Sequence, residues 1–525
     1  MNPRFDIARR FVETAKARPG DEAVRGDGLS LTYGECLALA TGAADAIAAA
    51  VGPGECVGLS IRKSHRAIVM MLACLIAGVP YVPIDPGAPP RRRLQILADA
   101  DPRLLVVSAG AADDWPEEEF GGLPGLPATL LGDDLRVARR AAAGSAEIAR
   151  NDLAYVLYTS GSTGTPKGVM ISRANAGYFV DWAAAAFPLG PGDQVAQHAP
   201  LHFDLPVYDV FVTLVSGGCL HLMDERTVMF PASAYRFLRE REITALYAVP
   251  SALNSLLQRS GLAEDGLPRL RRLLYAGEEF HVPRLRALVA ALPEDAQVAN
   301  LYGPVETNVV TWEWVTPALL EGDRMPIGSA VPGTEVRLLG EDGVLRSADA
   351  EGELLVSGPS VTPGYLNDPE RTSRALVPFA SDGGERVYYR TGDLASADGA
   401  GVLRFQGRRD GMVKTRGFRV ELGDVEAAVL RHPQVVQAVV RPIPHAEFGT
   451  VLQAHVVLDA GLNTGLTTGL TTGPDGAAPL TPPALRRWLA GQVPAYMVPA
   501  TVTVHRELPT TSTGKIARSA LGGTH

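Results

Sequence analysis

The sequence predicts an α/β protein with a large N-terminal domain, residues 1–409, and a small α+β C-terminal domain, residues 410–525. Its 525 residues exceed what a single compact core usually holds, so at least two domains are expected. Helix-like and strand-like patterns alternate through about residue 400, which is typical of an α/β architecture. The pattern changes at the basic segment 407–419, and we place the domain boundary inside it.

The N-terminal part shows two long helical patterns, followed by several short apolar runs. The helices are expected at 34–51 and 64–78, and the buried strands at 154–157, 245–249, 272–275 and 298–301. Ligands of open α/β sheets gather at the carboxyl ends of the strands. We therefore expect the functional segments to begin where these strands end.

The last block of the chain carries enough pattern for a small domain. Helices are expected at 421–430 and 483–491, and strands at 435–441 and 453–458. The segment 461–479 contains the repeat GLTTGLTTG and is too rich in glycine to pack. We interpret it as a flexible surface insertion.

Charge and hydropathy exclude two classes of partner. The formal net charge is −9 and the pI is about 5.7, so no broad positive surface for nucleic acid is expected. The N-terminus lacks the apolar core of a signal peptide, and the longest apolar run, 67–82, is broken by Gly78 and Pro80. We expect a cytoplasmic protein that neither binds nucleic acid nor spans a membrane.

Lysine is rare in this chain. It occurs at positions 16, 63, 167, 414 and 515 only, among 49 basic residues. Where arginine has replaced lysine at most sites, the remaining lysines are enriched at places that need a compact ammonium group rather than a planar guanidinium. Lys167, Lys414 and Lys515 lie in segments that contain glycine, and we expect these lysines to have a function.

The strongest single signal is the segment YTSGSTGTPKG, residues 158–168, which we expect between a buried strand and a helix. Its backbone amides and hydroxyls can surround phosphate oxygens, with Lys167 as the countercharge. It is not a Walker A loop, because Pro166 precedes the lysine and Gly168 follows it. The alternative is a flexible linker, which does not explain the lysine. The residues expected around the phosphates are Thr159, Ser160, Gly161, Ser162, Thr163 and Gly164.

Nine further segments accompany this loop in the order of a known family's core motifs. They are LTYGE (31–35), GVPYVPID (78–85), NLYGPVET (300–307), GEL with GYL (352–354 and 364–366), YRTGD (389–393), GRRD (407–410), KTRGFR (414–419), PAYMVP (494–499) and TGK (513–515). In these motifs the chain resembles the adenylate-forming superfamily, specifically the adenylation domains of nonribosomal peptide synthetases. The resemblance spans almost the whole chain and implies ATP-dependent activation of a carboxylate.

In that reaction a carboxylate attacks the α-phosphate of ATP, so positioning and charge compensation must bring two anions together. By resemblance, Lys515 bridges the substrate carboxylate and the α-phosphate, and Glu306 holds Mg²⁺ near the phosphates, as a hard cation prefers. The expected catalytic residues are thus Lys515, Lys167 and Glu306. The expected cofactors are ATP and Mg²⁺.

The resemblance also implies the other nucleotide contacts. Asp393 suits the two ribose hydroxyls as a bidentate acceptor, with Arg408 assisting, and Tyr302 is expected to stack on adenine. The remaining expected contacts are Asn300 and Gly277 near the adenine edge and Phe405 beside the ribose.

Asp410 matches the hinge position of this family. The resemblance implies that the C-terminal domain rotates there, presenting Lys515 for adenylation and then the segment 414–419 for thiol transfer. From the residues alone, Asp410 is only a linker residue.

Asp204 indicates the class of substrate, because by resemblance it pairs with the α-ammonium of an amino acid. The positions that match the family's pocket lining are Leu205, Tyr208, Tyr247, Leu274, Ala276, Leu301, Val309 and Val310. None is charged, and two phenol hydroxyls are the only polar side-chain groups, so the lining favours a small apolar side chain. It resembles the lining of free-standing L-prolyl-AMP ligases. L-Proline is the expected substrate, and another small apolar amino acid is the alternative.

The sequence departs from the family pattern at Val305, where a hydroxyl residue is usual, and this change bears on the rate rather than on the reaction. The chain ends ten residues after Lys515, so we expect the acceptor to be a separate phosphopantetheinylated carrier protein. Two alternatives are an acyl-CoA ligase, against which Asp204 weighs, and a catalytically silent scaffold, against which the lysines and carboxylates of the motifs weigh.

Overall fold

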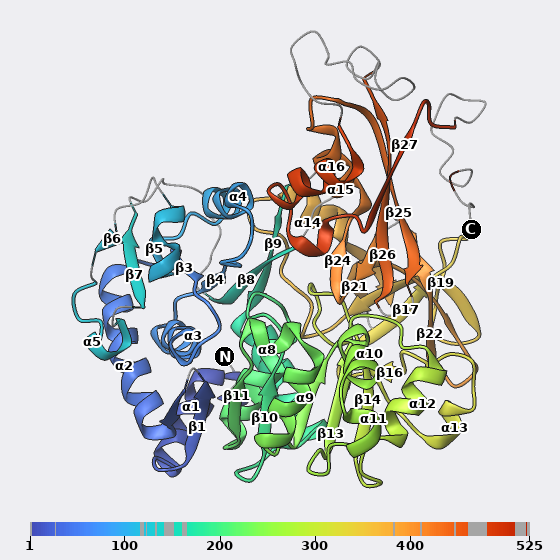
Figure 1. Cartoon of the computed structure of the whole chain (residues 1–525). Coiled ribbons are helices and arrows are strands. Elements are labelled where there is room, and N and C mark those ends of the chain that lie inside the picture. Colours follow the sequence, from blue (N-terminus) through green and yellow to red (C-terminus); the bar gives the residue numbers. More distant parts are fainter. Residues whose placement is uncertain are drawn as a thin grey trace. The chain divides into compact units, whose positions relative to one another are not determined.

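The computed structural model of the protein describes residues 3–26, 28–115, 120–121, 123–131, 134–140, 152–159, 165–381, 384–409, 412–445, 448–459, 480–509 and 521. The chain forms a mixed α/β fold with a large N-terminal and a small C-terminal part (Figure 1). Its contacts divide it into two compact units. The larger unit contains Met1–Pro86, Ile96–Tyr158 and Lys167–Arg409, and the smaller one contains Gly87–Gln95, Thr159–Pro166 and Asp410–His525.

Within the described ranges, nine strands form the largest sheet of the larger unit. In spatial order they are β16 (Ser329–Ala330), β15 (Thr311–Trp314), β14 (Gln297–Tyr302), β13 (Arg272–Ala276), β12 (Ala245–Ala248), β10 (Gln194–Gln197), β11 (Cys219–Leu222), β1 (Glu22–Gly26) and β2 (Leu29–Thr32). From β14 to β1 all pairs are parallel, so the carboxyl ends of these strands meet at one edge.

Helices cover both faces of this sheet. One face carries α8 (Glu225–Met229), α9 (Pro231–Glu240), α10 (Pro250–Arg259), α11 (Leu262–Asp265), α12 (Val282–Ala290) and α13 (Pro317–Leu320) (Figure 1). The other face shares a core with α1 (Ile7–Ala17), α2 (Tyr33–Ala50), α3 (His65–Ala77) and α6 (Arg173–Ala186). Burial on both faces explains why these strands are short apolar runs without alternation.

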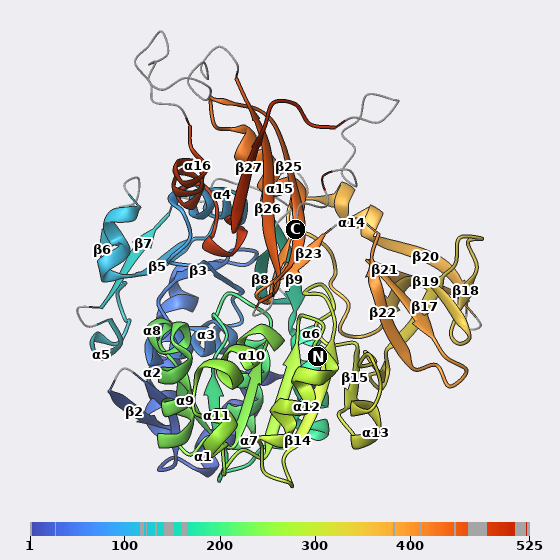
Figure 2. The same ribbon diagram turned by 45° about the vertical axis from the view of Figure 1, so that its right-hand side comes forward.

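A second sheet of the larger unit packs against the same helices. It runs β6 (Phe120–Gly121), β7 (Leu135–Arg139), β5 (Leu104–Ser108), β3 (Val57–Ser60), β4 (Tyr81–Pro83), β8 (Leu153–Thr159) and β9 (Lys167–Ser172). The third sheet contains β18 (Leu345–Arg346), β17 (Glu335–Leu339), β19 (Ala350–Ser357), β21 (Gly384–Ala397) and β20 (Leu376–Ser381), with β22 (Leu403–Arg408) paired to β21 (Figure 2).

The smaller unit has its own apolar core. It contains the hairpin β23 (Val413–Thr415) and β24 (Phe418–Val420), the sheet β25 (Val435–His445), β26 (Gly449–Leu458) and β27 (Thr501–His505), and the helices α15 (Leu422–Leu430) and α16 (Pro482–Ala490). The hairpin turns through Arg416 and Gly417, whose φ angles of 53° and 82° match a two-residue turn that requires positive φ.

The remaining described elements are short, apart from α4. They are α4 (Pro90–Ala100), α5 (Ala128–Leu131), α7 (Thr213–Ser216), α14 (Pro369–Ala375), the 3₁₀ helices Pro3–Phe5, Ala109–Asp114 and Ala495–Met497, and the π-helix η4 (Val207–Val212). Across the described part of the chain, every helix is too short or too polar to cross a membrane.

The predicted helices near the N-terminus are confirmed, and local chemistry explains their ends. Thr32 and Glu35 form a capping box at the start of α2, in which each side chain accepts a hydrogen bond from the other residue's backbone amide. Gly78 ends α3 with a φ of 74°, a left-handed conformation that glycine adopts without a steric cost.

One local prediction is wrong. The sequence predicts a helix directly after the phosphate-type loop, but Lys167 begins strand β9, and α6 follows that strand. The segment from Lys167 to Ser172 is buried at every position, so it suits an inner strand with both faces covered.

Candidate functional site

Glu306 and Lys167 form a buried ion pair in the larger unit. The Lys167 ammonium lies 3.4 Å from Glu306 Oε1, and the two side chains are 6% and 0% exposed. Tyr365 donates a hydrogen bond of 2.9 Å to the same oxygen, and its ring centroid lies 5.4 Å from the Lys167 ammonium. A buried charge is tolerated when it is paired and hydrogen-bonded. The structure thus joins the two residues predicted to act on the phosphates and Mg²⁺.

Asp393 and Arg408 form a second buried ion pair. They are register partners on β21 and β22, and their side chains are 3% and 7% exposed. Tyr302, at the end of β14, donates a hydrogen bond to Asp393, and its ring centroid lies 6.5 Å from that of Phe405. Burial raises the pKa of Tyr302 well above its usual value, so the phenol keeps the proton that it donates. Four residues predicted to contact the nucleotide therefore lie together.

The structure describes only some of the other residues predicted to contact the nucleotide. The side-chain amide of Asn300 donates a 2.8 Å hydrogen bond to the Pro326 carbonyl, which fixes its orientation on β14. Gly277 follows β13 with a φ of 94°. Thr159 ends β8, and its buried hydroxyl has no hydrogen-bond partner among the described residues. The residues that fall outside the described ranges are Ser160, Gly161, Ser162, Thr163, Gly164, Asp410, Lys515 and the segment 461–479.

The predicted substrate lining forms a buried apolar group. Leu205, Tyr208, Tyr247, Leu274, Ala276, Leu301 and Val309 all belong to one core cluster and are at most 9% exposed. Val310 instead packs with Tyr302 and Ile327 in a neighbouring cluster. The alternation of side chains along an extended segment explains why the two valines separate.

Asp204 follows the carboxyl end of β10 and is half-buried. Its carboxylate is close enough to Tyr247 to add to the effect of burial in raising the pKa of that phenol. A negative charge therefore lies beside the uncharged lining, after a strand that the sequence analysis did not predict.

Tyr208 presents its ring rather than its hydroxyl to the lining. The hydroxyl donates a 3.3 Å hydrogen bond to the Phe187 carbonyl, and the Tyr208 ring meets that of Tyr247 edge to face, at 5.9 Å and 86°. Phe187 in turn lies 5.2 Å from Trp312, centroid to centroid. This aromatic backing holds Tyr208 in one orientation, which the sequence does not reveal.

The sequence does not predict a role for Lys63 at the substrate segment. Its ammonium donates hydrogen bonds of 3.1 and 2.8 Å to the carbonyls of Gln197 and His198, at the end of β10 from which the segment with Asp204 begins. Burial lowers the pKa of Lys63 to about 7. The rarity of lysine was the available signal, but Lys63 is not in a glycine-bearing segment.

Asp209 is a second residue without a predicted role. It lies in the π-helix η4, next to Tyr208, and neither of its buried carboxylate oxygens has a hydrogen-bond partner among the described residues. Burial raises its pKa well above the usual value, although the charge of Lys63 opposes this shift. π-Helical turns often mark functional sites, and this one carries a residue of the lining.

Comparison with known proteins shows the enzyme family to which the chain belongs. Residues 11–366 match the AMP-binding enzyme family, and residues 424–515 match the AMP-binding enzyme C-terminal domain. The chain belongs to the AMP-binding enzymes, which are adenylate-forming ligases.

Two curated proteins and one solved structure are similar to this chain over most of its length. The chain is 37% identical to an L-proline--[L-prolyl-carrier protein] ligase of Pseudomonas fluorescens, over 90% of this chain and 89% of the relative. It is 35% identical to the Streptomyces coelicolor enzyme of the same name, over 94% and 92%. Among solved structures it is similar to holo-PA1221, an NRPS protein containing adenylation and PCP domains and bound to a vinylsulfonamide inhibitor. That similarity has a TM-score of 0.79 and 28% identity, over 98% of this chain and 84% of the other. The resemblance to NRPS adenylation domains is confirmed.

Proposed function

We propose that this protein uses ATP to activate L-proline as prolyl-AMP and transfers the prolyl group to the phosphopantetheine thiol of a carrier protein. The observation that carries this proposal is the half-buried Asp204 carboxylate beside a buried lining without charge. The names and extent of the two relatives described above support the choice of proline and of a carrier protein as acceptor.

The chemistry of proline matches these residues. Its secondary ammonium needs an anion, which Asp204 supplies, and its ring carries no polar atom that requires a partner. Because the Tyr208 hydroxyl is already bonded to Phe187, the lining offers that ring few unsatisfied groups. A substrate without an ammonium forgoes the ion pair with Asp204 and so loses that part of the binding free energy. This loss argues against fatty and aryl acids.

ATP and Mg²⁺ are part of the proposal. Mg²⁺ commonly binds proteins through one or two carboxylates and takes its other ligands from substrate phosphates and water. Glu306, held by Lys167 and Tyr365, is such a carboxylate. A single protein carboxylate of this kind fits a Mg²⁺ ion whose other ligands are phosphate oxygens and water. The ion supplies charge neutralisation at the phosphates.

The roles of the remaining residues follow from charge and geometry. We assign Asp393 to the ribose hydroxyls, with Arg408 holding its orientation, and Tyr302 and Phe405 to the adenosine. We assign Lys515 to the reacting carboxylate and α-phosphate, and residues 159–164 to the phosphates. A domain boundary at Asp410 and movement of the C-terminal domain are part of the same proposal.

The test is loading of a purified phosphopantetheinylated carrier protein, followed by intact mass. Wild type is expected to add one prolyl group when ATP, Mg²⁺ and proline are present. Asp204→Asn removes the charge at nearly constant volume and is expected to reduce loading strongly, whereas Asp265→Asn, at an exposed position of α11, is not. Efficient loading of aryl or fatty acids, unaffected by Asp204→Asn, would overturn the amino-acid assignment. Transfer to free coenzyme A instead of the carrier would favour a CoA ligase.

A further inference from the structure

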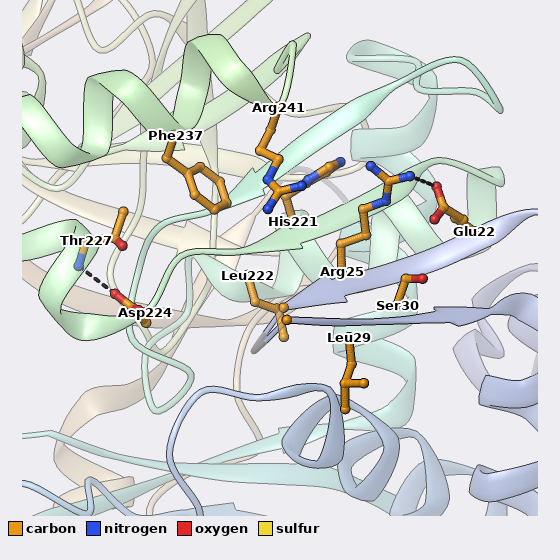
Figure 3. A pocket seen from close by; sticks show the side chains of 12 residues that line it. Glu22, Arg25, Leu29, Ser30, His221, Leu222, Asp224, Thr227, Phe237 and Arg241 are labelled. Atoms are coloured by element: carbon orange, nitrogen blue, oxygen red, sulfur yellow. Dashed lines mark hydrogen bonds and ion pairs between the residues drawn. The ribbon is translucent and has the colours of Figure 1, made fainter.

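A polar cavity of about 600 Å³ lies away from every residue assigned above. It is bounded by β1, β2 and β11 and by the helices α8 and α9 of the larger unit (Figure 3). Arg25 comes from β1, His221 from β11 and Arg241 from the end of α9. Figure 3 shows the imidazole of His221 between the guanidinium groups of the two arginines.

His221 presents an unused hydrogen-bond acceptor here. The residue is 1% exposed, and its Nε2 lies 2.7 Å from Gln194 Oε1, an acceptor, so Nε2 carries the ring hydrogen. Nδ1 is then a bare lone pair, and it has no hydrogen-bond partner among the described residues. Burial and the two neighbouring arginines lower the pKa of His221 to about 4, so the ring stays neutral near pH 7. A buried acceptor without a donor requires an explanation.

The charges around His221 are unbalanced. Arg25 is paired with Glu22, whereas Arg241 is exposed and makes no ion pair with any residue that the structure describes. Two guanidinium groups and one carboxylate act on the imidazole, so positive charge predominates at this end of the cavity, whose lining also includes the Asp224 carboxylate. Asp224, at the other end of the cavity, is held by the backbone amide of Thr227.

We propose that this cavity binds a small phosphate, whose charge is met by Arg241 and Arg25 and whose protonated oxygen donates a hydrogen bond to Nδ1 of His221. A planar guanidinium suits a phosphate because it can donate two parallel hydrogen bonds. Phe237, whose ring centroid lies 6.4 Å from that of His221, adds an apolar wall that suits the organic part of a phosphate ester. The ligand is thus free phosphate or a small phosphate monoester.

Calorimetric titration of the full chain at pH 6 tests this site, and the variants described below separate its binding from binding at the proposed nucleotide site. At this pH, phosphate and phenyl phosphate carry an O–H in a large fraction of molecules, whereas sulfate has a similar shape but no proton. Wild type is expected to bind phosphate about tenfold or more tightly than sulfate, because sulfate leaves the buried Nδ1 acceptor without a hydrogen bond. Tighter binding of phenyl phosphate than of phosphate identifies an ester as the ligand, and equal binding identifies free phosphate.

Three variants locate the binding. Arg241→Gln, at an exposed position, is expected to lower the affinity for both phosphate and sulfate about tenfold. His221→Phe is expected to remove the preference for phosphate over sulfate. Arg236→Gln removes the same charge from the exposed side of α9, outside the cavity, and is expected to change nothing. If His221→Phe does not fold, the phosphate and sulfate titrations of wild type test the same contact. Equal affinity of wild type for the two anions, or unchanged phosphate binding in Arg241→Gln, would overturn the proposal.

Discussion

The ammonium of Lys167 lies 3.4 Å from the carboxylate of Glu306, and both side chains are almost completely buried. The two residues come from different motifs, one at the start of β9 and the other in the loop after β14. Each compensates the charge of the other, and Tyr365 fixes the carboxylate with a hydrogen bond. The charges predicted to serve the phosphates are therefore already oriented by their own partners, which reduces the reorganisation needed when the nucleotide binds.

Glu306→Gln tests whether this carboxylate serves the reaction. The variant keeps an oxygen for the Tyr365 hydroxyl but loses the charge, so we expect kcat for proline-dependent ATP–pyrophosphate exchange to fall about 100-fold or more, as for other preorganised electrostatic groups. The exposed Glu321→Gln is the matched control and should keep wild-type activity. Exchange by Glu306→Gln that stays close to the wild-type rate, in folded protein, would contradict the assigned role.

Asp393→Asn tests the ribose assignment. We expect KM for ATP to rise while KM for proline changes little, because Asp393 is assigned to the nucleotide alone. The change also leaves the buried Arg408 without its carboxylate, so the free energy of unfolding should fall by about 3–5 kcal/mol. Steady-state kinetics and urea titration measure the two effects. Asp349→Asn, at an exposed turn, is the control, and an equal rise in both KM values would argue against a nucleotide-specific role.

Lys63→Met tests whether Lys63 positions the segment that carries Asp204. Loss of the hydrogen bonds to Gln197 and His198 should raise KM for proline more than KM for ATP. Lys16→Met, on an exposed position of α1, should leave both unchanged. A uniform loss of kcat with unchanged KM values would show that Lys63 does not act through the substrate segment.

The pKa of Lys63 gives a separate prediction. Its value in the folded protein is about 7, below the ordinary 10.5, so between these values the unfolded chain binds more protons than the folded one. The contribution of Lys63 to the free energy of unfolding therefore rises with pH through this window. Urea titrations at two pH values inside the window should show wild type gaining stability relative to Lys63→Met at the higher pH. A constant difference would mean that the pKa of Lys63 is ordinary.

Lys515→Ala tests the residue assigned to the reacting carboxylate. It should nearly abolish proline-dependent exchange, while the dissociation constant of ATP, measured by equilibrium binding, stays largely unchanged, because Lys515 is assigned to the transition state rather than to nucleotide binding. Lys16→Ala is the control. Full exchange activity in Lys515→Ala would refute the assignment.

The parts of the fold that the sequence predicts are those fixed by neighbouring residues. The capping pair Thr32 and Glu35 and the left-handed Gly78 delimit their helices by contacts within a few residues. The apolar runs of the inner strands were likewise predictable, because burial on both faces demands them. Strand β9 was missed because a short apolar run after a glycine-rich loop does not distinguish strand from helix.

Contacts between distant segments could not be predicted in this way. Tyr302 meets Asp393, and Tyr365 meets Glu306, only because sheet pairing and loop packing bring together residues far apart in the chain. The family motifs indicated which residues matter, but not that Tyr365 holds Glu306. For His221 and its cavity no motif gave any signal, because the site depends on a strand and a helix end that look ordinary in the sequence.

Amino-acid-dependent ATP–pyrophosphate exchange, measured with each of the twenty amino acids, decides whether the protein activates proline. We expect strong exchange with L-proline, weaker exchange with other small apolar amino acids, and none with charged ones, because Asp204 selects the ammonium and the uncharged lining selects the side chain. Absence of exchange with proline, alongside strong exchange with another amino acid, would contradict the proline assignment. Absence of exchange with all twenty amino acids would contradict amino-acid activation.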